Sequence, residues 1–316
     1  MSRRAPWTII GSSNEYNVST AGELITLADL DWRVNLSEVQ TTEGLEIKNR
    51  FATVKTTQDG DQSVLAVVGS RYQVIQNAEI FSCLDDVVGS GEARYAAAGE
   101  LGGGKVVWTV LELPEDVSVG NDEHTGYIVA RSSHDGSTPF QMTPVMQRLA
   151  CTNGINLTML HGKKNNQYYS IRHTENYQLN ANDIRLALNL VRQDMAAYVD
   201  MSNVLSSLRF DDTEFKTFAQ NVFPLPAKIE FVSDELLSAG EKRAKTAAMR
   251  KRTNAYSVWL GETDTQHNLR GTKFGAFQAI VETIDHFGNN KNKQAERALL
   301  GTDTSIKHRA LQLLGV

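Results

Sequence analysis

The hydrophobic period of the chain changes near residue 180, and this change restricts the folds available to it. Before this point, apolar residues roughly alternate in short runs such as 45–56, as they do in β-strands. After it, apolar residues recur every three or four positions, which predicts a long amphipathic helix over 182–208. Units in which strands and helices alternate are absent. The sequence therefore predicts an α+β fold, with an antiparallel β-rich N-terminal half and a helical C-terminal half.

Turn residues and helix signals divide the two halves further. Asp59-Gly60 and the glycine-rich ELGGG segment each separate two β-rich runs, as hairpin turns do. A short helix is expected over 77–89 with Asn77 as its N-cap, and another begins at Ser233. Nearly all strands should lie within 45–175. We divide the chain into an N-terminal arm, a β-rich α+β core that includes the long helix, and a helical region, at residues 1–40, 41–210 and 211–316.

Charge is distributed unevenly along the 316 residues, whose formal net charge is −5. Residues 1–240 contain 19 basic and 30 acidic side chains, a net of −11, whereas residues 241–316 contain 13 and 7, a net of +6. An acidic body with a basic region is typical of a soluble protein that meets polyanions with part of its surface. The densest basic stretch predicts either a polyanion-binding or a simply solvated helix, and comprises Lys242, Arg243, Lys245, Arg250, Lys251 and Arg252.

The pattern of apolar and cysteine residues favours a cytoplasmic protein. No run of about 18 apolar residues occurs, so no membrane-spanning helix is expected. The apolar stretch at the N-terminus is too short for a secretory signal. Cys83 and Cys151 stand apart in apolar contexts, which predicts buried reduced thiols rather than a disulfide or a zinc site.

The segment GELGGGK has the outline of a phosphate-binding loop but lacks two of its requirements. Gly99, Gly104 and Lys105 fit the spacing, yet Val106 follows where a Ser or Thr would ligate Mg²⁺. The segment after it alternates as a strand, whereas a phosphate-binding loop must open a helix. We therefore expect a glycine-rich hairpin turn.

Candidate metal and catalytic groups are equally incomplete. Glu282, Asp285 and His286 have ligand-capable spacing on one helix, but no further cluster of ligands accompanies them, so a solvated helix face is expected. His134 and His161 lie in loop-like segments, and no serine elbow motif occurs. The sequence predicts neither an enzyme nor a bound cofactor or metal.

A basic segment with aromatic residues points to nucleic acid instead. Lys163 and Lys164 lie in a polar turn before a strand on which Tyr168 and Arg172 share one face. Lysines and arginines can follow a phosphate backbone while an aromatic ring stacks on bases. Arg131 and Arg148, in neighbouring predicted segments, are secondary candidates. The alternative is an exposed hairpin with ordinary surface lysines.

Four segments, in the same order along the chain, resemble phage and plasmid-like proteins of the domain-of-unknown-function family 932. They cover much of 40–316 and read RYQVIQNAEIFSCLDDVV, RLACTNGINL, FGAFQAIVETIDHF and LGTDTSIKHRALQLL. The β-rich half followed by a long helix is similar to the β-β-β-α core of phage single-strand annealing proteins of the Redβ and Erf type. That resemblance implies rings or filaments that bind single-stranded DNA in a basic groove without ATP.

The leading hypothesis is a non-enzymatic phage protein of the infected bacterial cytoplasm that binds and anneals single-stranded DNA in recombination. It would act as a homo-oligomer, with a ring as one form, and would contact no membrane. The alternative hypothesis is a phage accessory protein that binds a host protein and inhibits a defence or regulatory pathway.

The glycine-rich segment generates a first prediction. The purified protein should hydrolyse no ATP, because Val106 cannot ligate Mg²⁺ and the loop leads into a strand. Replacement Lys105→Ala should leave the protein's function unchanged. A phosphate-release assay on both proteins checks this, and ATPase activity that disappears in Lys105→Ala would contradict the hairpin interpretation.

Overall fold

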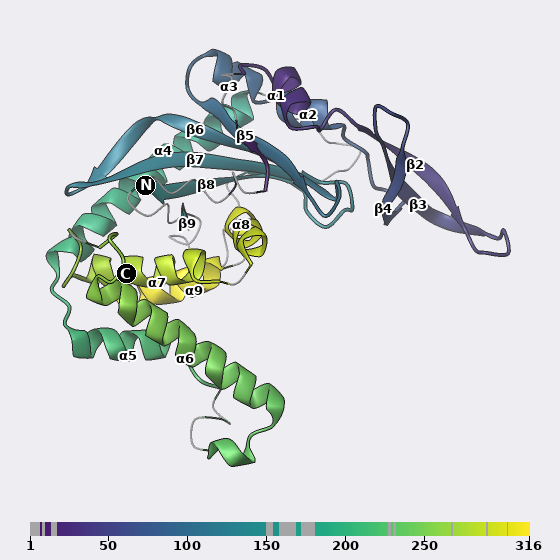
Figure 1. Cartoon of the computed structure of the whole chain (residues 1–316). Helices are drawn as coiled ribbons and strands as arrows, with labels where there is room; N and C mark the ends of the chain where they lie inside the picture. The colour runs from purple at the N-terminus through teal and green to yellow at the C-terminus, as the bar shows by residue number, and fades with distance from the viewer. Residues whose placement is uncertain are drawn as a thin grey trace.

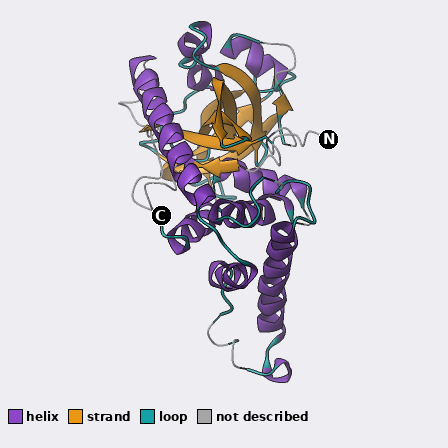
Figure 2. Ribbon diagram, turned by 90° about the vertical axis from the view of Figure 1, so that its left-hand side faces the viewer, coloured by secondary structure: helices purple, strands orange, loops and turns teal. Residues whose placement is uncertain are grey.

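The computed structural model has the α+β architecture that the sequence predicts, with antiparallel strands in the N-terminal half and helices in the C-terminal half (Figures 1 and 2). Its described residues are 7, 10–13, 18–149, 154–157, 169–171, 181–226, 229, 232–266, 268–288, 290–301 and 303–316.

The main sheet is an antiparallel meander with short strands added at both edges. Its strand order is β1-β5-β6-β7-β8-β10, and β9 also pairs with β8. The glycine-rich segment forms the turn between β5 and β6, where Gly102, Gly103 and Gly104 all have positive φ angles. The hairpin prediction is therefore confirmed. The strands are β1 (Ser12–Ser13), β5 (Arg94–Leu101), β6 (Val106–Val119), β7 (Asp122–Ser133), β8 (Phe140–Arg148), β9 (Gly154–Asn156) and β10 (Tyr169–Ile171).

A second sheet of three antiparallel strands extends from one end of the body (Figure 1). It consists of β2 (Arg33–Gln40), β3 (Glu46–Thr56) and β4 (Gln62–Gly69). Gly60 adopts a φ of 86° in the β3–β4 turn, as the Asp59-Gly60 signal predicts. Since β2 pairs with β3, the boundary placed at residue 40 falls inside this sheet, and β1 and β2 precede the range expected to hold the strands.

Two helix starts differ from the sequence prediction. The helix expected over 77–89 is two short helices, and Gln76 rather than Asn77 is the first N-cap. Asn77 is buried instead, where its amide donates to the Leu30 carbonyl oxygen. The helix expected at Ser233 is divided in two: Ser233 is the N-cap of a short 3-10 helix over Asp234–Leu236, and α6 begins after Ser238, whose hydroxyl accepts from the Glu241 N–H in a capping box. An apolar pattern locates a helix, but caps five residues apart look alike in sequence.

The other helices follow the predicted pattern. Helix α4 spans the expected 182–208 almost completely, and helices α5 to α9 form the C-terminal region, from which α6 projects (Figure 1). None of the described helices combines the length and the hydrophobicity needed to cross a bilayer. The helices are α1 (Ala21–Leu27), α2 (Asn77–Ser82), α3 (Asp85–Gly89), α4 (Ala181–Ser207), α5 (Asp212–Val222), α6 (Ala239–Leu260), α7 (Lys273–His286), α8 (Lys291–Leu300) and α9 (Thr304–Leu313).

Both faces of the main sheet are covered. The inner face of α4, including Leu188 and Val191, shares one large hydrophobic core with side chains of β6, β7 and β8 and with α7. On the opposite face, Trp108 packs with Trp7 and Leu299 in a smaller cluster. Alternate side chains of a strand therefore pack into two different cores, one on each face of the sheet. This explains why strands such as β8 are buried along their whole length.

Gly275 on α7 allows this helix to pass close to the loop before it, which gives a second prediction. A Cβ atom at Gly275 would lie 2.1 Å from the carbonyl oxygen of Leu269, and backbone cannot move aside easily. We expect Gly275→Ala to lower the free energy of unfolding by roughly 1–3 kcal/mol, measured by urea denaturation. Gly240→Ala is the matched control, because no atom lies within 4 Å of its Cβ position on α6. That change should be neutral or stabilise by up to about 1 kcal/mol. Equal effects of the two changes would contradict the packing.

Candidate functional site

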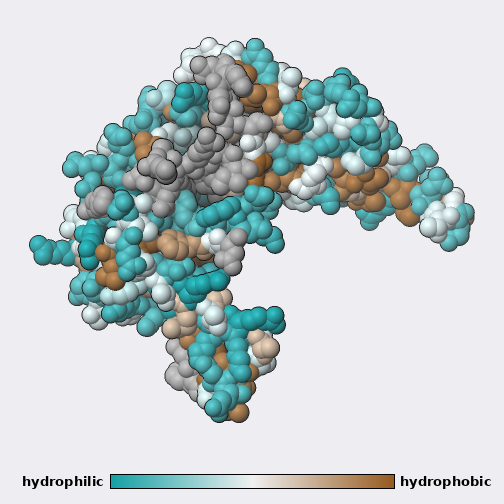
Figure 3. Space-filling model, viewed as in Figure 1, coloured by the Kyte–Doolittle hydropathy of each residue, from teal (hydrophilic) through white to brown (hydrophobic). Residues whose placement is uncertain are grey.

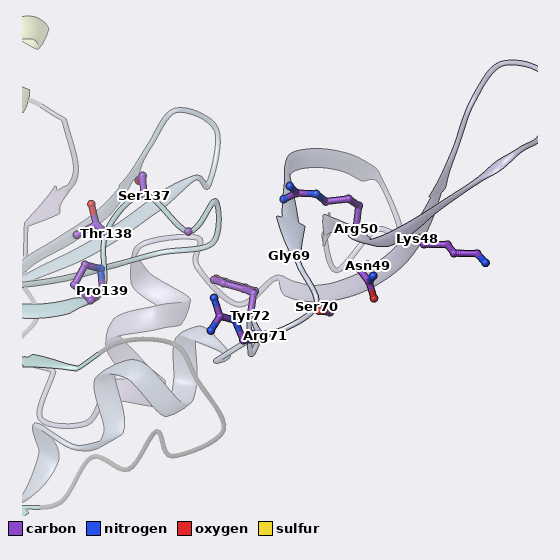
Figure 4. A pocket seen from close by; sticks show the side chains of 11 residues that line it. Lys48, Asn49, Arg50, Gly69, Ser70, Arg71, Tyr72, Ser137, Thr138 and Pro139 are labelled. Atoms are coloured by element: carbon purple, nitrogen blue, oxygen red, sulfur yellow. The ribbon is translucent and has the colours of Figure 1, made fainter.

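A cleft of about 920 Å³ separates the second sheet from the body (Figure 4). One wall comes from β3 and from the segment that follows β4, and the other wall is the turn between β7 and β8. The lining residues are Lys48, Asn49, Arg50, Gly69, Ser70, Arg71, Tyr72, Gly136, Ser137, Thr138 and Pro139.

The cleft carries three positive charges and no lining carboxylate. Lys48, Arg50 and Arg71 are all exposed. Within the described part of the chain, none of the three has an ion-pair partner, whereas Lys55 nearby is paired with Glu100 at 2.7 Å. In Figure 4 the Arg50 and Arg71 side chains extend toward the body, and Lys48 extends away from it. Two guanidinium groups are thus available to an anion in the cleft.

Tyr72 fixes the wall that carries Arg71. Its hydroxyl donates a hydrogen bond to the Ser133 carbonyl oxygen at 2.9 Å, which connects the segment after β4 to the end of β7. Burial, with a smaller contribution from Asp135, raises the pKa of the Tyr72 phenol far above its usual range, so it stays neutral. The opposite turn is fixed too, because the Ser133 hydroxyl donates to the Thr138 carbonyl oxygen at 2.8 Å.

The base of the second sheet is held against the body by Lys55. Its ammonium group lies 4.3 Å from the centre of the Trp32 ring and bonds Glu100 on β5. The Trp32 ring in turn meets buried His134 edge-on at 5.3 Å between ring centres. Gly104 lies directly over Trp32, where a Cβ atom would come within 3.2 Å of the ring. These contacts set how far the two walls of the cleft stand apart.

The groups that line the cleft have the chemistry to bind anions. Guanidinium and ammonium groups bind phosphate or carboxylate oxygens through charge-assisted hydrogen bonds. The lining contains no histidine, cysteine or carboxylate that could act as a nucleophile or a general base. Nowhere among the described residues do three His, Cys, Asp or Glu side chains gather as a metal site requires.

Only a few residues of the basic hairpin predicted from the sequence are among the described residues. Lys163, Lys164, Tyr168 and Arg172 lie outside the described residues. From that segment the structure describes β10, which pairs with β8 so that Ser170 stands opposite Gln141. The strand predicted over 167–174 is confirmed for Tyr169–Ile171, and the nucleic-acid role of the hairpin stays a prediction.

Arg131 and Arg148 are placed as structural residues. The Arg131 guanidinium donates to the side-chain oxygen of Gln141 at 2.9 and 3.1 Å. Arg148 is buried and its Nε pairs with the carboxylate of Asp122. Neither side chain lines the cleft. Strand alternation cannot tell which face of a sheet is covered, so these two arginines were indistinguishable in sequence from surface ones.

The six basic residues of α6 lie apart from the cleft, on the helix that projects from the C-terminal region (Figure 1). Lys245 pairs with Asp234 at 2.5 Å, and the Arg252 Nε donates to the Phe223 carbonyl oxygen at 3.0 Å. Lys251 lies over the Phe223 ring. The remaining three are exposed, and they are Lys242, Arg243 and Arg250.

The acidic face of α7 is buried rather than solvated, which corrects the sequence prediction. Glu282 is fully buried and accepts a hydrogen bond from the Thr265 hydroxyl at 2.6 Å. Asp285 accepts from the Lys307 ammonium at 2.7 Å and from the Gly154 N–H at 3.0 Å. Burial raises the pKa of Asp285 although Lys307 opposes this. The Asp285 carboxylate connects α7 to α9 and β9, and the Glu282 carboxylate connects α7 to the segment that precedes it.

The cleft residues were missed in the sequence because they are far apart in it. Lys48 and Arg50 precede Arg71 by about 20 positions, so no local charge cluster marks them. The turn that faces them lies a further 65 positions along the chain, at 136–139. The one local signal is Asn49, whose φ of 59° interrupts the alternation of β3 between the two basic residues.

The fold and the cleft define an α+β protein with a positively charged cleft between two antiparallel sheets. The family model for the domain of unknown function DUF932 matches residues 64–303, and the chain belongs to this family. The match includes Arg71 and the β7–β8 turn but not Lys48 or Arg50. No curated protein and no solved structure is significantly similar to the chain.

The buried network around Arg148 gives a prediction about pH. His124 is fully buried beside Asp122 and 3.3 Å from the Tyr198 hydroxyl, and burial lowers the pKa of its imidazole. The unfolded chain therefore binds a proton at His124 near pH 6.5 that the folded chain does not, and stability falls as pH falls below that value. For one such proton, the free energy of unfolding falls by at most about 1.4 kcal/mol per pH unit.

We expect His124→Gln to lose less stability than the parent between pH 7.5 and 5.5 when urea midpoints are compared. His308→Gln is the control, since His308 is only half-buried, and it should keep the pH dependence of the parent. A His124→Gln variant with the same pH dependence as the parent would contradict the role of this histidine.

Proposed function

We propose that this protein binds single-stranded DNA through the cleft between its two sheets and acts as an oligomer without ATP. The observation that carries the proposal is the set of three exposed cations, Lys48, Arg50 and Arg71, in a cleft without lining carboxylates. A non-enzymatic role in strand annealing by a phage protein, as the family resemblance implies, is compatible with this surface.

A polymeric anion explains the cleft better than a small one. The cavity is much larger than one phosphate group, and its cations come from two separate chain segments, β3 and the connection after β4. A strand with a phosphate at every nucleotide could contact several of them in succession. Because the protein carries a net charge of −5, a locally positive cleft would direct such a strand to one part of its surface.

The basic hairpin and the projecting helix extend this proposal. Lys163, Lys164 and Arg172 would add phosphate contacts, and Tyr168 would stack on a base. The exposed cations of α6 are a separate candidate surface, since they lie on another part of the molecule; they are Lys242, Arg243, Arg250 and Lys251.

A second candidate function rests on exposed apolar side chains of the projecting sheet. Leu45, Val64 and Val67 are 68%, 65% and 53% exposed, and Figure 3 shows apolar side chains gathered along this part of the molecule. Exposed apolar patches often mark surfaces that bind other proteins. This observation supports the alternative in which a phage accessory protein binds and inhibits a host protein.

The cleft generates a prediction for DNA binding. The triple variant Lys48→Ala, Arg50→Ala, Arg71→Ala should bind a labelled oligonucleotide more weakly than the parent. It should also show a shallower dependence of log K on log salt, by about 0.7 for each lost phosphate contact and about 2 in all. Fluorescence anisotropy over a salt series measures both quantities.

The matched control removes the same charge elsewhere, with Arg270→Ala, Lys293→Ala and Arg309→Ala, which are exposed residues outside the cleft. Its affinity and salt dependence should stay near those of the parent. Equal binding by the two triple variants would remove the cleft from the site. Absence of binding by the parent in about 0.05 M salt would favour the protein-binding alternative.

A further inference from the structure

Helix α4 has two apolar faces, and only one of them is used within the chain. Its inner face is buried against the main sheet and α7. In Figure 2 this long helix crosses in front of the sheet. Leu186, Leu190 and Val204 are 63%, 44% and 59% exposed, and Leu208, just beyond the helix end, is 41% exposed.

The outer face of α4 also lacks the charges of an ordinary solvated helix. One of its ten exposed positions between residues 184 and 207 is charged, namely Asp200; the others are Leu186, Asn189, Leu190, Gln193, Ala196, Ala197, Asn203, Val204 and Ser207. On α6, four of ten exposed positions are charged: Lys242, Arg243, Arg250 and Lys251. Depletion of charge together with exposed leucines is the composition of an interface core.

The exposed apolar residues are arranged symmetrically about Ala197. Leu190 and Val204 are each seven residues from it, and Leu186 and Leu208 are each eleven residues from it. At 100° per residue, Leu186, Leu190 and Val204 lie within about 20° of the Ala197 direction, and Leu208 follows one residue beyond the helix end, so the stripe is about 33 Å long. Asp200 lies about 60° to the side of this stripe.

A stripe with this symmetry is complementary to itself when reversed. We propose that the α4 stripe, defined as Leu186, Leu190, Ala197, Val204 and Leu208, pairs with the same stripe of a second copy in antiparallel orientation. The two-fold axis passes at Ala197, where the small side chain permits close approach of the helices. Leu190 then meets the partner's Val204, and Leu186 meets the partner's Leu208, as a two-fold interface requires.

The size of the stripe limits the strength of the pairing. A strip about 33 Å long and one helix wide, about 10–12 Å, covers roughly 400 Å² per copy, about half of what a stable dimer of standard size contributes. We therefore expect a concentration-dependent dimer. This interface deepens the proposed function, because it rests on the oligomer invoked there and identifies one surface that would form it.

Cysteine cross-linking tests the antiparallel geometry. Ala197→Cys should form a disulfide-linked dimer under mild oxidation, because the two thiols face each other at the axis. Leu190→Cys alone and Val204→Cys alone should not, since their copies would stand about 21 Å apart along the helices. A mixture of those two variants should cross-link. The parent is the control for the native thiols, and burial raises the pKa of Cys83 to about 12, which slows its reaction.

Light scattering tests the stripe without DNA. The parent should show a rising molar mass up to about 200 μM, a range suited to weak interfaces. Leu190→Glu with Val204→Glu should remain monomeric. Asn189→Glu with Asn203→Glu adds the same charge beside the stripe and should still dimerise. Circular dichroism of every variant verifies folding.

A monomeric parent, or efficient self-cross-linking of Leu190→Cys with none of Ala197→Cys, would overturn the proposed interface. Because these measurements contain no nucleic acid, they fail or succeed independently of the cleft. A dimer that binds no DNA would support the interface and contradict the proposed function. A monomer that binds DNA would contradict the interface and leave the DNA-binding proposal intact.

Discussion

The contact of Lys55 with Trp32 and Glu100 determines the shape of the candidate site. A three-stranded sheet that extends from a body has few contacts to hold its orientation, and Lys55 supplies two of them, a 2.7 Å ion pair and a cation–π contact. Both groups of the ion pair are largely removed from water, which strengthens it relative to a surface pair. The Tyr72 hydrogen bond to the end of β7 adds a second attachment at the cleft itself. Val34 and Leu65 of the second sheet also pack in the large core, and the Gln76 side chain bonds the N–H and the carbonyl oxygen of Val34, so several contacts together hold this sheet against the body.

Buried polar groups join the β-rich half to the helical half. The carboxylate of Asp285 on α7 binds both Lys307 on α9 and the backbone of β9, so that three elements meet at one charge. Tyr198 on α4 similarly stands between His124 on β7 and Gln278 on α7, at 3.3 Å from each. Apolar packing would tolerate small shifts of these helices, whereas breaking such a buried pair leaves an uncompensated group. These networks therefore fix the register of α4 and α7 against the sheet, and with it the direction of the outer face of α4.

Much of the fold follows from local sequence patterns, and almost none of the cleft does. The Asp59-Gly60 turn, the glycine-rich hairpin and the long helix were predictable because turn chemistry and periodicity act over a few residues. Helix starts were predicted less well, since Ser233 caps only the short 3-10 helix Asp234–Leu236 and α6 begins after Ser238. Burial explains the remaining differences, because Arg148 and Glu282 are buried although their residue types usually lie on the surface. Lys48, Arg50 and Arg71 form one surface only after β3 and the β7–β8 turn have been brought together.

The charged cleft and the apolar α4 stripe lie on different parts of the molecule, so the proposed DNA binding and the proposed dimer formation would use different surfaces. The cleft lies at the projecting sheet, while the α4 stripe lies on a helix that covers the main sheet, so neither surface uses residues of the other. In an antiparallel pair of α4 helices, the two-fold axis would give each dimer two clefts related by that axis. A strand bound in one cleft would then be held by the same assembly as a strand bound in the other, and annealing requires two strands held together. A single cleft would bind weakly if only a few phosphates were neutralised, and in the proposed dimer a strand long enough to reach both clefts would meet the second one at a raised effective concentration.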